Sequence, residues 1–262
     1  IKKVVRNNKG RFFIYALISV VYVAMIAAFY PAVEENRDKF EELLSAYPPA
    51  LVEAFGISGE TFTTFLGFMS AEYFSLMYLI LLCLFIFSLG TGIIAGERDR
   101  GTAEYTFTLP CKRSTIFRVS FVALFGMVLA IIGISLLSVI VSAKILGEQV
   151  VGVGISDFFI LSLLMSFALL SFTTFISSLF RSTSKVYGAC AAFLVGSYLI
   201  HVLASLSSTA ENIYFFSFLK YYGNPTAILM GHGVPGEHLL VFLIAGAAFL
   251  AATVYKLKKA DL

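Results

Sequence analysis

Charged side chains are scarce in this sequence, and a dense cluster of both signs lies in the stretch "GERDRGTAEYTFTLPCKRSTIFR" at residues 96–118. This stretch holds five of the 19 Lys and Arg residues and three of the 16 Asp and Glu residues. Long apolar runs lie on both sides of it, "LMYLILLCLFIFSLGTGIIA" before and "FVALFGMVLAIIGISLLSVIV" after. A cluster of both signs can form ion pairs with another surface, or it can be a solvated loop, so the order of its residues matters.

That order predicts a short helix between two breaks. Gly96 ends the preceding helix, and Gly101 breaks the turn that follows. Thr102 is suited to be an N-cap, and Glu104 lies in the first turn, where the helix dipole favours an acid. The helix would cover "AEYTFTL" and stop before Pro110. We therefore expect a defined element here, with an aromatic side along the inner membrane surface.

No other residues combine into a catalytic or metal-binding constellation. His232 and His238 lie six residues apart, and a zinc site would need two further converging ligands. The glycines of "GTGIIAG" and "GVGIS" follow no strand and precede no Lys-Ser/Thr pair, so they form no phosphate loop; Gly90 and Gly92 rather allow close helix packing. We predict no catalytic residues, no metal, no cofactor and no ATP hydrolysis by this chain.

The composition predicts the elements that carry the charged cluster. Of the 262 residues, 59% are hydrophobic and only 13% are charged, whereas a soluble domain carries about 25% charged residues. We predict an all-α integral membrane protein with a single transmembrane domain over residues 1–262. A barrel would show alternating strands of about ten residues, which are missing. Six apolar runs are long enough to span a bilayer as helices, at 12–30, 73–95, 117–142, 158–180, 186–206 and 239–255.

The distribution of Lys and Arg predicts the orientation. The N-terminal segment, the loops between spans 2 and 3 and between spans 4 and 5, and the C-terminal segment hold 15 of the 19 Lys and Arg residues. Positive residues favour the cytoplasmic side, so we predict both termini in the cytoplasm. A basic inner face also attracts anionic lipid, so the lipid bilayer is an expected partner and nucleic acid is not.

Two long segments lie on the predicted outer side. Residues 31–72 form an extracellular loop rich in acids, and residues 207–238 are too aromatic for a solvated loop, so we predict an outer re-entrant segment of short helices. Glu72 lies near the outer end of span 2, and His201 lies late in span 5. Both are possible pathway or interface residues, although Glu72 can also reach the outer interface and His201 can hydrogen-bond between helices.

The charged cluster resembles the corresponding segment of the permease subunits of ABC-2 type transporters. That family has roughly E-x-x-x-G-T, then a short helix that ends in a Leu and Pro pattern, then basic residues before the next span. Six spans, both termini inside, an aromatic outer segment before span 6 and a basic C-terminus also fit. The long acidic loop at 31–72 is the departure and leaves the substrate open. The residues that match the motif are Glu97, Gly101, Thr102, Pro110, Lys112, Arg113 and Ser114.

The resemblance implies a membrane subunit without its own ATPase. It would pair with a second permease copy or homologue and with ATP-binding cassette ATPase subunits, which bind ATP and Mg²⁺. A coupling helix in the coupling region 96–116 would dock on the ATPase, and residues 1–11 would form an interfacial helix. The residues that this implies for coupling are Glu97, Arg98, Asp99, Arg100, Gly101, Thr102, Glu104, Tyr105, Phe107 and Pro110.

The family also implies an exporter in the cell membrane of a prokaryote, with the coupling helix moving spans 1, 2 and 5 at a dimer interface. Its substrate would be a drug, an antimicrobial peptide or a lipid-like amphipathic molecule. A gradient-driven secondary transporter, the first alternative, would need buried ionisable residues or broken helices. An intramembrane enzyme would need paired Glu with Arg and two His inside spans, whereas Glu34 and Glu35 lie on the outer side. The hydroxyls of "SFTTFISS" can line a pathway or bond their own helix, and we favour the second.

Overall fold

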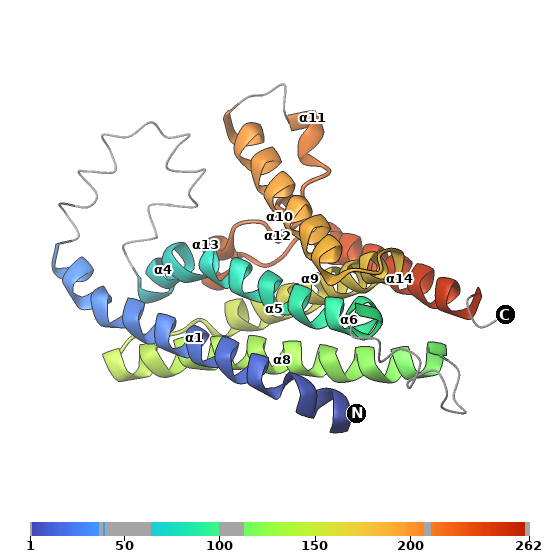
Figure 1. Cartoon of the computed structure of the whole chain (residues 1–262). Helices are drawn as coiled ribbons and strands as arrows, with labels where there is room; N and C mark the ends of the chain where they lie inside the picture. The colour runs from blue at the N-terminus through green and yellow to red at the C-terminus, as the bar shows by residue number, and fades with distance from the viewer. Residues whose placement is uncertain (1, 37–38, 40–63, 100–112, 207–210, 260–262) are drawn as a thin grey trace.

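The fold is helical in every part of the chain that the structure, a computed structural model, describes: residues 2–36, 39, 64–99, 113–206 and 211–259. No strand occurs among these residues (Figure 1). The elements are α1 Lys2–Glu35, α4 Phe65–Met69, η2 Ser70–Phe74, α5 Met77–Ile93, α6 Ala95–Asp99, α8 Arg113–Leu146, α9 Gly152–Leu179, α10 Thr183–Leu206, α11 Glu211–Tyr214, α12 Phe218–Tyr222, α13 Pro225–Ala227, η4 Ile228–His232 and α14 Gly236–Lys259, where η marks a π-helix.

Within these residues, five helices are long and apolar enough to cross a membrane: α1, α8, α9, α10 and α14. A sixth candidate is the bent pair formed by Phe65–Phe74 and Met77–Ile93, whose axes differ by 43°. The predicted all-α fold is confirmed, and the six predicted spans correspond to these five helices and the bent pair counted as one span. The helices run beyond the predicted spans: α8 has 34 residues and is about 50 Å long, against a hydrocarbon core of about 30 Å.

The predicted outer loop at 31–72 is too long at both ends. Helix α1 continues through Pro31 to Glu35, and residues 65–74 are helical. All five residues of α4 are buried, so this aromatic stretch packs against protein instead of standing in water. The remainder of the predicted loop, apart from residues 36, 39 and 64, lies outside the described residues.

The bend in the second span lies between η2 and α5. Ser75 donates to the carbonyl of Ser70 from both its backbone N–H and its hydroxyl, each at 2.8 Å. Leu76 follows with φ −130° and ψ −52°, outside the helical region. The Tyr222 hydroxyl of α12 donates to the carbonyl of Phe74 over 2.7 Å. Ser75 and, from another helix, Tyr222 thus supply partners for backbone carbonyls near the bend, as backbone at membrane depth requires.

Residues 2–11, the predicted interfacial helix, form the first turns of α1 and run into the first span without a break. Nothing in this segment stops a helix, because it lacks proline and a single Gly10 costs only about 1 kcal/mol. The predicted boundary at residue 11, between an interfacial helix and the first span, is therefore wrong. The interfacial position of these turns stays a prediction.

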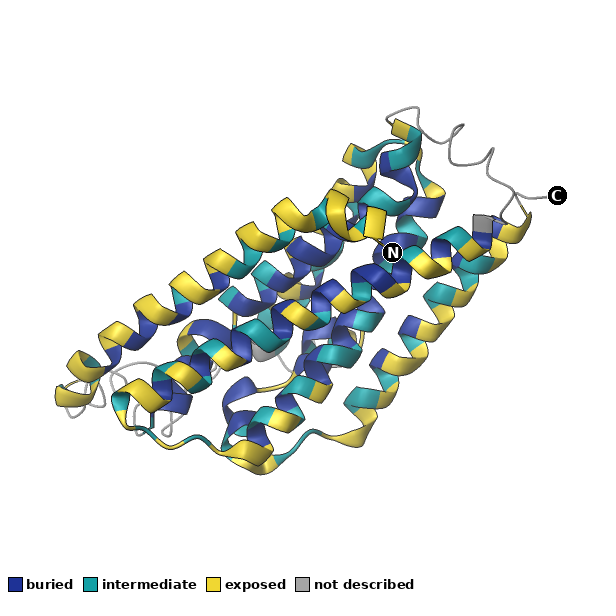
Figure 2. Cartoon of the chain, turned by 90° about the horizontal axis from the view of Figure 1, so that it is seen from below, coloured by how far each residue is buried: buried dark blue, intermediate teal, exposed yellow. Residues whose placement is uncertain are grey.

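Helix α9 lies at the centre of the bundle, in contact with α5, α8, α14 and η4. Helix α1 packs along α8, and its outward face is exposed (Figure 2). Helix α10 departs most from the bundle in Figure 1 and carries exposed apolar residues, including Tyr187, Val195 and Leu199. The core is therefore built around α9, and α10 stands at its edge.

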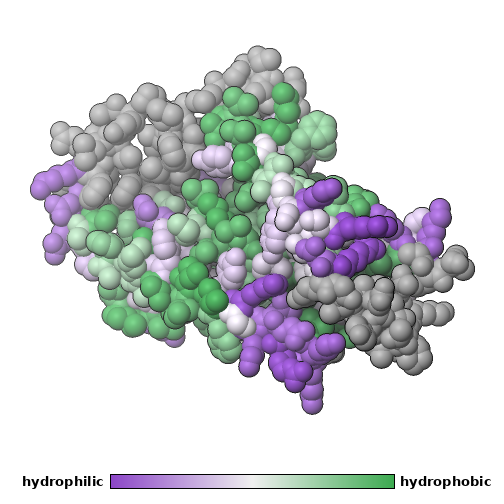
Figure 3. Space-filling view, in the orientation of Figure 1, coloured by the Kyte–Doolittle hydropathy of each residue, from purple (hydrophilic) through white to green (hydrophobic). Residues whose placement is uncertain are grey.

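The first turn of α1 and the last turn of α14 lie at the same end of the bundle (Figure 1), as an even number of spans requires. Hydrophilic side chains gather at that end, and a largely hydrophobic region lies beside them (Figure 3). This distribution suits a protein whose middle contacts lipid and whose ends contact water. The assignment of that end to the cytoplasm stays a prediction.

The described part of the predicted re-entrant segment consists of short helices, α11 to η4, that pack against the bundle. Ser217 and Asn224 cap α12 and α13 with their side-chain oxygens, and Pro225 takes the first position of α13. Gly231, at φ 91°, interrupts η4 in a conformation that favours glycine. Capped ends and buried side chains such as Leu229 make this segment an ordered part of the fold.

Candidate coupling site

The described parts of the coupling region lie in the short helix α6, which follows α5 after Ile94, and in residues 113–116 at the start of α8. The backbone N–H of Ala95 donates to Oγ of Ser177 in α9 over 2.9 Å, and the Ser177 hydroxyl lies 3.3 Å from the Thr91 carbonyl. Gly96 was predicted to end the helix, but it lies inside α6. The reason is that Ser177, 82 residues away in sequence, accepts a hydrogen bond from the Ala95 N–H. Without it, this N–H would have no partner in the first turn of the new helix.

Asp99, the last residue of α6, connects it to α10. Its Oδ2 accepts a hydrogen bond of 2.6 Å from the Thr183 hydroxyl and a longer one of 3.4 Å from the Thr183 backbone N–H. Thr183 is the first residue of α10. The carboxylate thus caps a helix that starts 84 residues later, and its charge is placed where a helix N-terminus favours an anion.

The other predicted coupling residues divide into two groups. Glu97 and Arg98 lie in α6 and are half-buried. The remaining seven lie outside the described residues, so their roles and the predicted coupling helix stay predictions; they are Arg100, Gly101, Thr102, Glu104, Tyr105, Phe107 and Pro110.

Helix α5 is attached to its neighbours just before α6. Nη1 of Arg11 donates to the carbonyl of Ser88 over 2.9 Å, which joins α1 to α5. On the other side, a Cβ on Gly90 would lie 2.7 Å from Cγ2 of Thr173 in α9, so close helix packing at Gly90 is confirmed. A Cβ on Gly92 would have only Nη1 of Arg11 within 4 Å, at 3.6 Å. Gly92 therefore lies beside the Arg11 side chain and does not bring two helix backbones close together.

Glu72 and His201, the two possible pathway residues, have different surroundings. Glu72 lies in η2 and is exposed, whereas the next residue, Tyr73, is buried. Nδ1 of His201 lies 2.9 Å from the hydroxyl of Tyr214 in α11. Burial raises the pKa of the Tyr214 phenol, so the phenol keeps its proton and can donate to His201. A hydrogen bond between helices, the simpler expectation for His201, is what the structure has.

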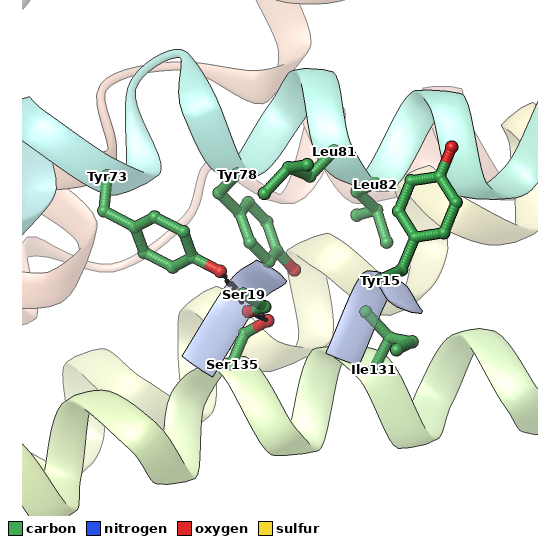
Figure 4. A pocket seen from close by; sticks show the side chains of 8 residues that line it. All are labelled: Tyr15, Ser19, Tyr73, Tyr78, Leu81, Leu82, Ile131 and Ser135. Atoms are coloured by element: carbon green, nitrogen blue, oxygen red, sulfur yellow. Dashed lines mark hydrogen bonds between the residues drawn. The ribbon is translucent and has the colours of Figure 1, made fainter. Parts of the chain in front are cut away.

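A second polar cluster, which the sequence did not indicate, lies deep in the bundle (Figure 4). The hydroxyls of Ser19, Tyr73 and Ser135 are 2.6 to 3.1 Å apart and join α1, η2 and α8. They line a small cavity with the hydroxyl of Tyr78, which is buried without a hydrogen-bond partner among the described residues. Isolated serines in apolar runs carry no local signal, because only the fold brings them together.

The hydroxyls of "SFTTFISS" in α9 bond mainly to helix backbone, as favoured. Thr173, Thr174 and Ser178 each contact a carbonyl three or four residues earlier, at 2.7 to 2.9 Å. Ser177 instead contacts α5 and α6, and Ser171 is buried without a partner among the described residues. This run therefore serves helix packing more than it lines an open path.

A helical bundle with up to six candidate spans and hydrophobic outer faces defines a multi-pass membrane protein. A family model described as ABC-2 family transporter protein matches residues 6–262. The chain belongs to this family, and the resemblance seen in the charged cluster is confirmed. No curated protein and no solved structure matches the chain significantly.

Proposed function

We propose that this chain is the permease subunit of an ATP-binding cassette exporter. Partner ATPase subunits would bind ATP and Mg²⁺, and the permease would move a drug, an antimicrobial peptide or a lipid-like amphipathic molecule outward across the cell membrane. The observation that carries the proposal is the family match over residues 6–262. The apolar, aromatic spans favour an amphipathic substrate over a hydrophilic one.

The surroundings of α6 support a coupling role for the residues that follow it. Helix α6 lies at the start of the coupling region 96–116, and residues 97–99 of this helix are among those assigned to docking on the ATPase. Its first residue is bonded to α9 and its last to α10. A short helix held at both ends can transmit a rigid-body displacement to the spans that hold it.

The polar interior favours this proposal over a gradient-driven carrier. The polar residues that are buried in the described part of the chain are serines and threonines, with no Asp, Glu, Lys, Arg or His among them. Proton- or ion-coupled carriers commonly place ionisable residues at membrane depth. Glu34 and Glu35, the acid pair considered for an intramembrane enzyme, are exposed at the end of α1.

Charge reversal in the coupling region tests the proposal. The double variant Arg98→Glu with Arg100→Glu should weaken capture of the partner ATP-binding cassette ATPase subunit by about tenfold or more, because each change replaces attraction by repulsion at the docking surface. Capture would be measured by co-purification from membranes in which both subunits are expressed. Lys144→Glu, an exposed cation at the other end of α8, is the matched control. Equal capture by the double variant and the control would refute this docking site.

The second permease copy is proposed to pack against the exposed face of α10. Gly188, Ala192 and Gly196 are spaced by four residues and so share one face of the helix. A Cβ on Gly188 or Gly196 would meet no atom within 4 Å, so these glycines serve no packing inside the described protomer. Small residues at this spacing allow two membrane helices to approach closely.

Bulky residues on this face should separate the two copies. Gly188→Leu with Gly196→Leu is expected to reduce the dimer fraction about tenfold in detergent, measured by light scattering after size-exclusion chromatography, because the leucines keep the helix backbones apart. Gly126→Leu, at an equally open glycine of α8, is the control. An unchanged dimer fraction in the α10 variant would place the second copy elsewhere.

A further inference from the structure

The hydrogen bonds between Asp99 and Thr183 join two segments that are separate in sequence. Asp99 ends α6 inside the coupling region proposed to dock on the ATPase, and Thr183 starts α10. The bond between the carboxylate and the threonine hydroxyl is 2.6 Å long, in the range of strong charge-assisted hydrogen bonds. A displacement of α6 therefore acts directly on the first turn of α10.

Within one described protomer, few other contacts hold the first half of α10 in place. Along this half, Val186 and Cys190 are buried, whereas Lys185, Tyr187 and Gly188 are exposed. A helix with so small a buried face moves as a unit when its end is pulled, because few side-chain contacts must be repacked. The hydrogen bonds from Thr183 to Asp99 therefore contribute strongly to the position of the first turn of α10.

The outer half of α10 is attached to the short outer helices. The Ser217 hydroxyl at the start of α12 donates to the Ser197 carbonyl of α10 over 2.8 Å. The rings of Phe193 and Phe218 stack with centroids 5.5 Å apart, and His201 contacts Tyr214 of α11. A movement of α10 must therefore carry α11 and α12 with it or break these contacts.

We infer that Asp99 is a positioning residue that transmits displacement of the coupling region through α10 to the outer helices α11 and α12. The inference rests on the proposed function, since ATP binding to the partner subunit supplies the displacement. In this role Asp99 contacts neither substrate nor nucleotide. It acts through Thr183, and the link persists while the helices move.

The test follows the outer helices while the ATPase is loaded. Spin labels at Ile213 of α11 and Leu240 of α14, both more than half exposed, would report their separation in a chain whose three native cysteines are replaced by alanine. In the complex with the co-expressed ATPase subunit, Mg²⁺ with a non-hydrolysable ATP analogue should shift the distance. Asp99→Ala and Thr183→Ala should each reduce the shifted population about tenfold, as expected for one lost hydrogen bond to a charged group.

Two variants separate transmission from simple loss of structure. Thr183→Ser keeps the hydroxyl and should respond like the unmodified chain, and Ser184→Ala removes an exposed neighbouring hydroxyl and should also respond fully. A full response in both Asp99→Ala and Thr183→Ala would overturn the inference. Amide exchange in the first turn of α10 should be about tenfold faster in these two variants; unchanged exchange would likewise count against the link.

The same measurements distinguish failure of the inference from failure of the proposed function. If the unmodified chain binds no ATPase subunit, the proposed function is wrong and the transmission role falls with it, whatever the exchange rates show. If the ATPase binds and the distance shifts in the unmodified chain but equally in the variants, only the inference is wrong.

Discussion

Replacement of Gly154 by alanine is expected to destabilise the protein by about 1–3 kcal/mol, the usual cost of overpacking a filled interior. Gly154 lies in the first turn of α9, under the π-helix η4. A Cβ there would meet the Leu229 carbonyl oxygen and would lie 2.5 Å from its carbon and 2.8 Å from the Ile228 oxygen. These are backbone atoms that cannot rotate away, so η4 itself must move.

The neighbouring Gly152 provides a matched control for this change. It lies two residues earlier in α9, and a Cβ there would meet no atom within 4 Å. Unfolding of the purified protein, measured by denaturant titration in mixed micelles, should show the loss for Gly154→Ala and little change for Gly152→Ala. Amide exchange in 225–232 should rise in the first variant alone. Equal stability of the two variants would show that η4 does not pack on Gly154.

The spans could be predicted from the sequence because length and apolarity are local properties. A run of about 20 apolar residues suffices to cross a bilayer, and each such run became part of a helix. Helix ends were less predictable, because helices continue past the hydrocarbon as long as their backbone groups find partners. Gly96 shows this: the local pattern favoured a stop, but Ser177 supplies the partner for Ala95 and a further helix follows.

The parts of the site that escaped prediction depend on contacts between distant segments. The bend after η2 has neither proline nor glycine at its break, at Ser75 and Leu76, and the Phe74 carbonyl next to it pairs with Tyr222, 148 residues away. Asp99 was placed in the coupling region from its motif, but its pairing with Thr183 crosses 84 residues. A single sequence specifies both partners of such a pair without indicating that they meet.

The π-helix η2 depends on Tyr73, and Tyr73→Ala is expected to cost about 3–5 kcal/mol, as for other buried aromatic rings replaced by alanine. Its side chain is 1% exposed. Its ring packs on Phe74 and Tyr78, with centroids 4.9 and 5.7 Å away, and its hydroxyl contacts Ser19 and Ser135. Removal of the ring leaves a cavity where α1, η2 and α8 meet, so the bend in the second span loses its main anchor to both helices.

Tyr73→Phe separates the ring from the hydroxyl. It should cost only about 1 kcal/mol, because Ser19 and Ser135 keep their mutual bond of 2.8 Å and the ring still fills its site. Tyr255→Ala, at a tyrosine that is 71% exposed, should change stability by less than about 0.5 kcal/mol. The measurement is again unfolding in mixed micelles. If Tyr73→Phe cost as much stability as Tyr73→Ala, the hydrogen bonds of the Tyr73 hydroxyl, and not the packing of its ring, would hold the bend. The contact between α1, η2 and α8 would then be mainly polar.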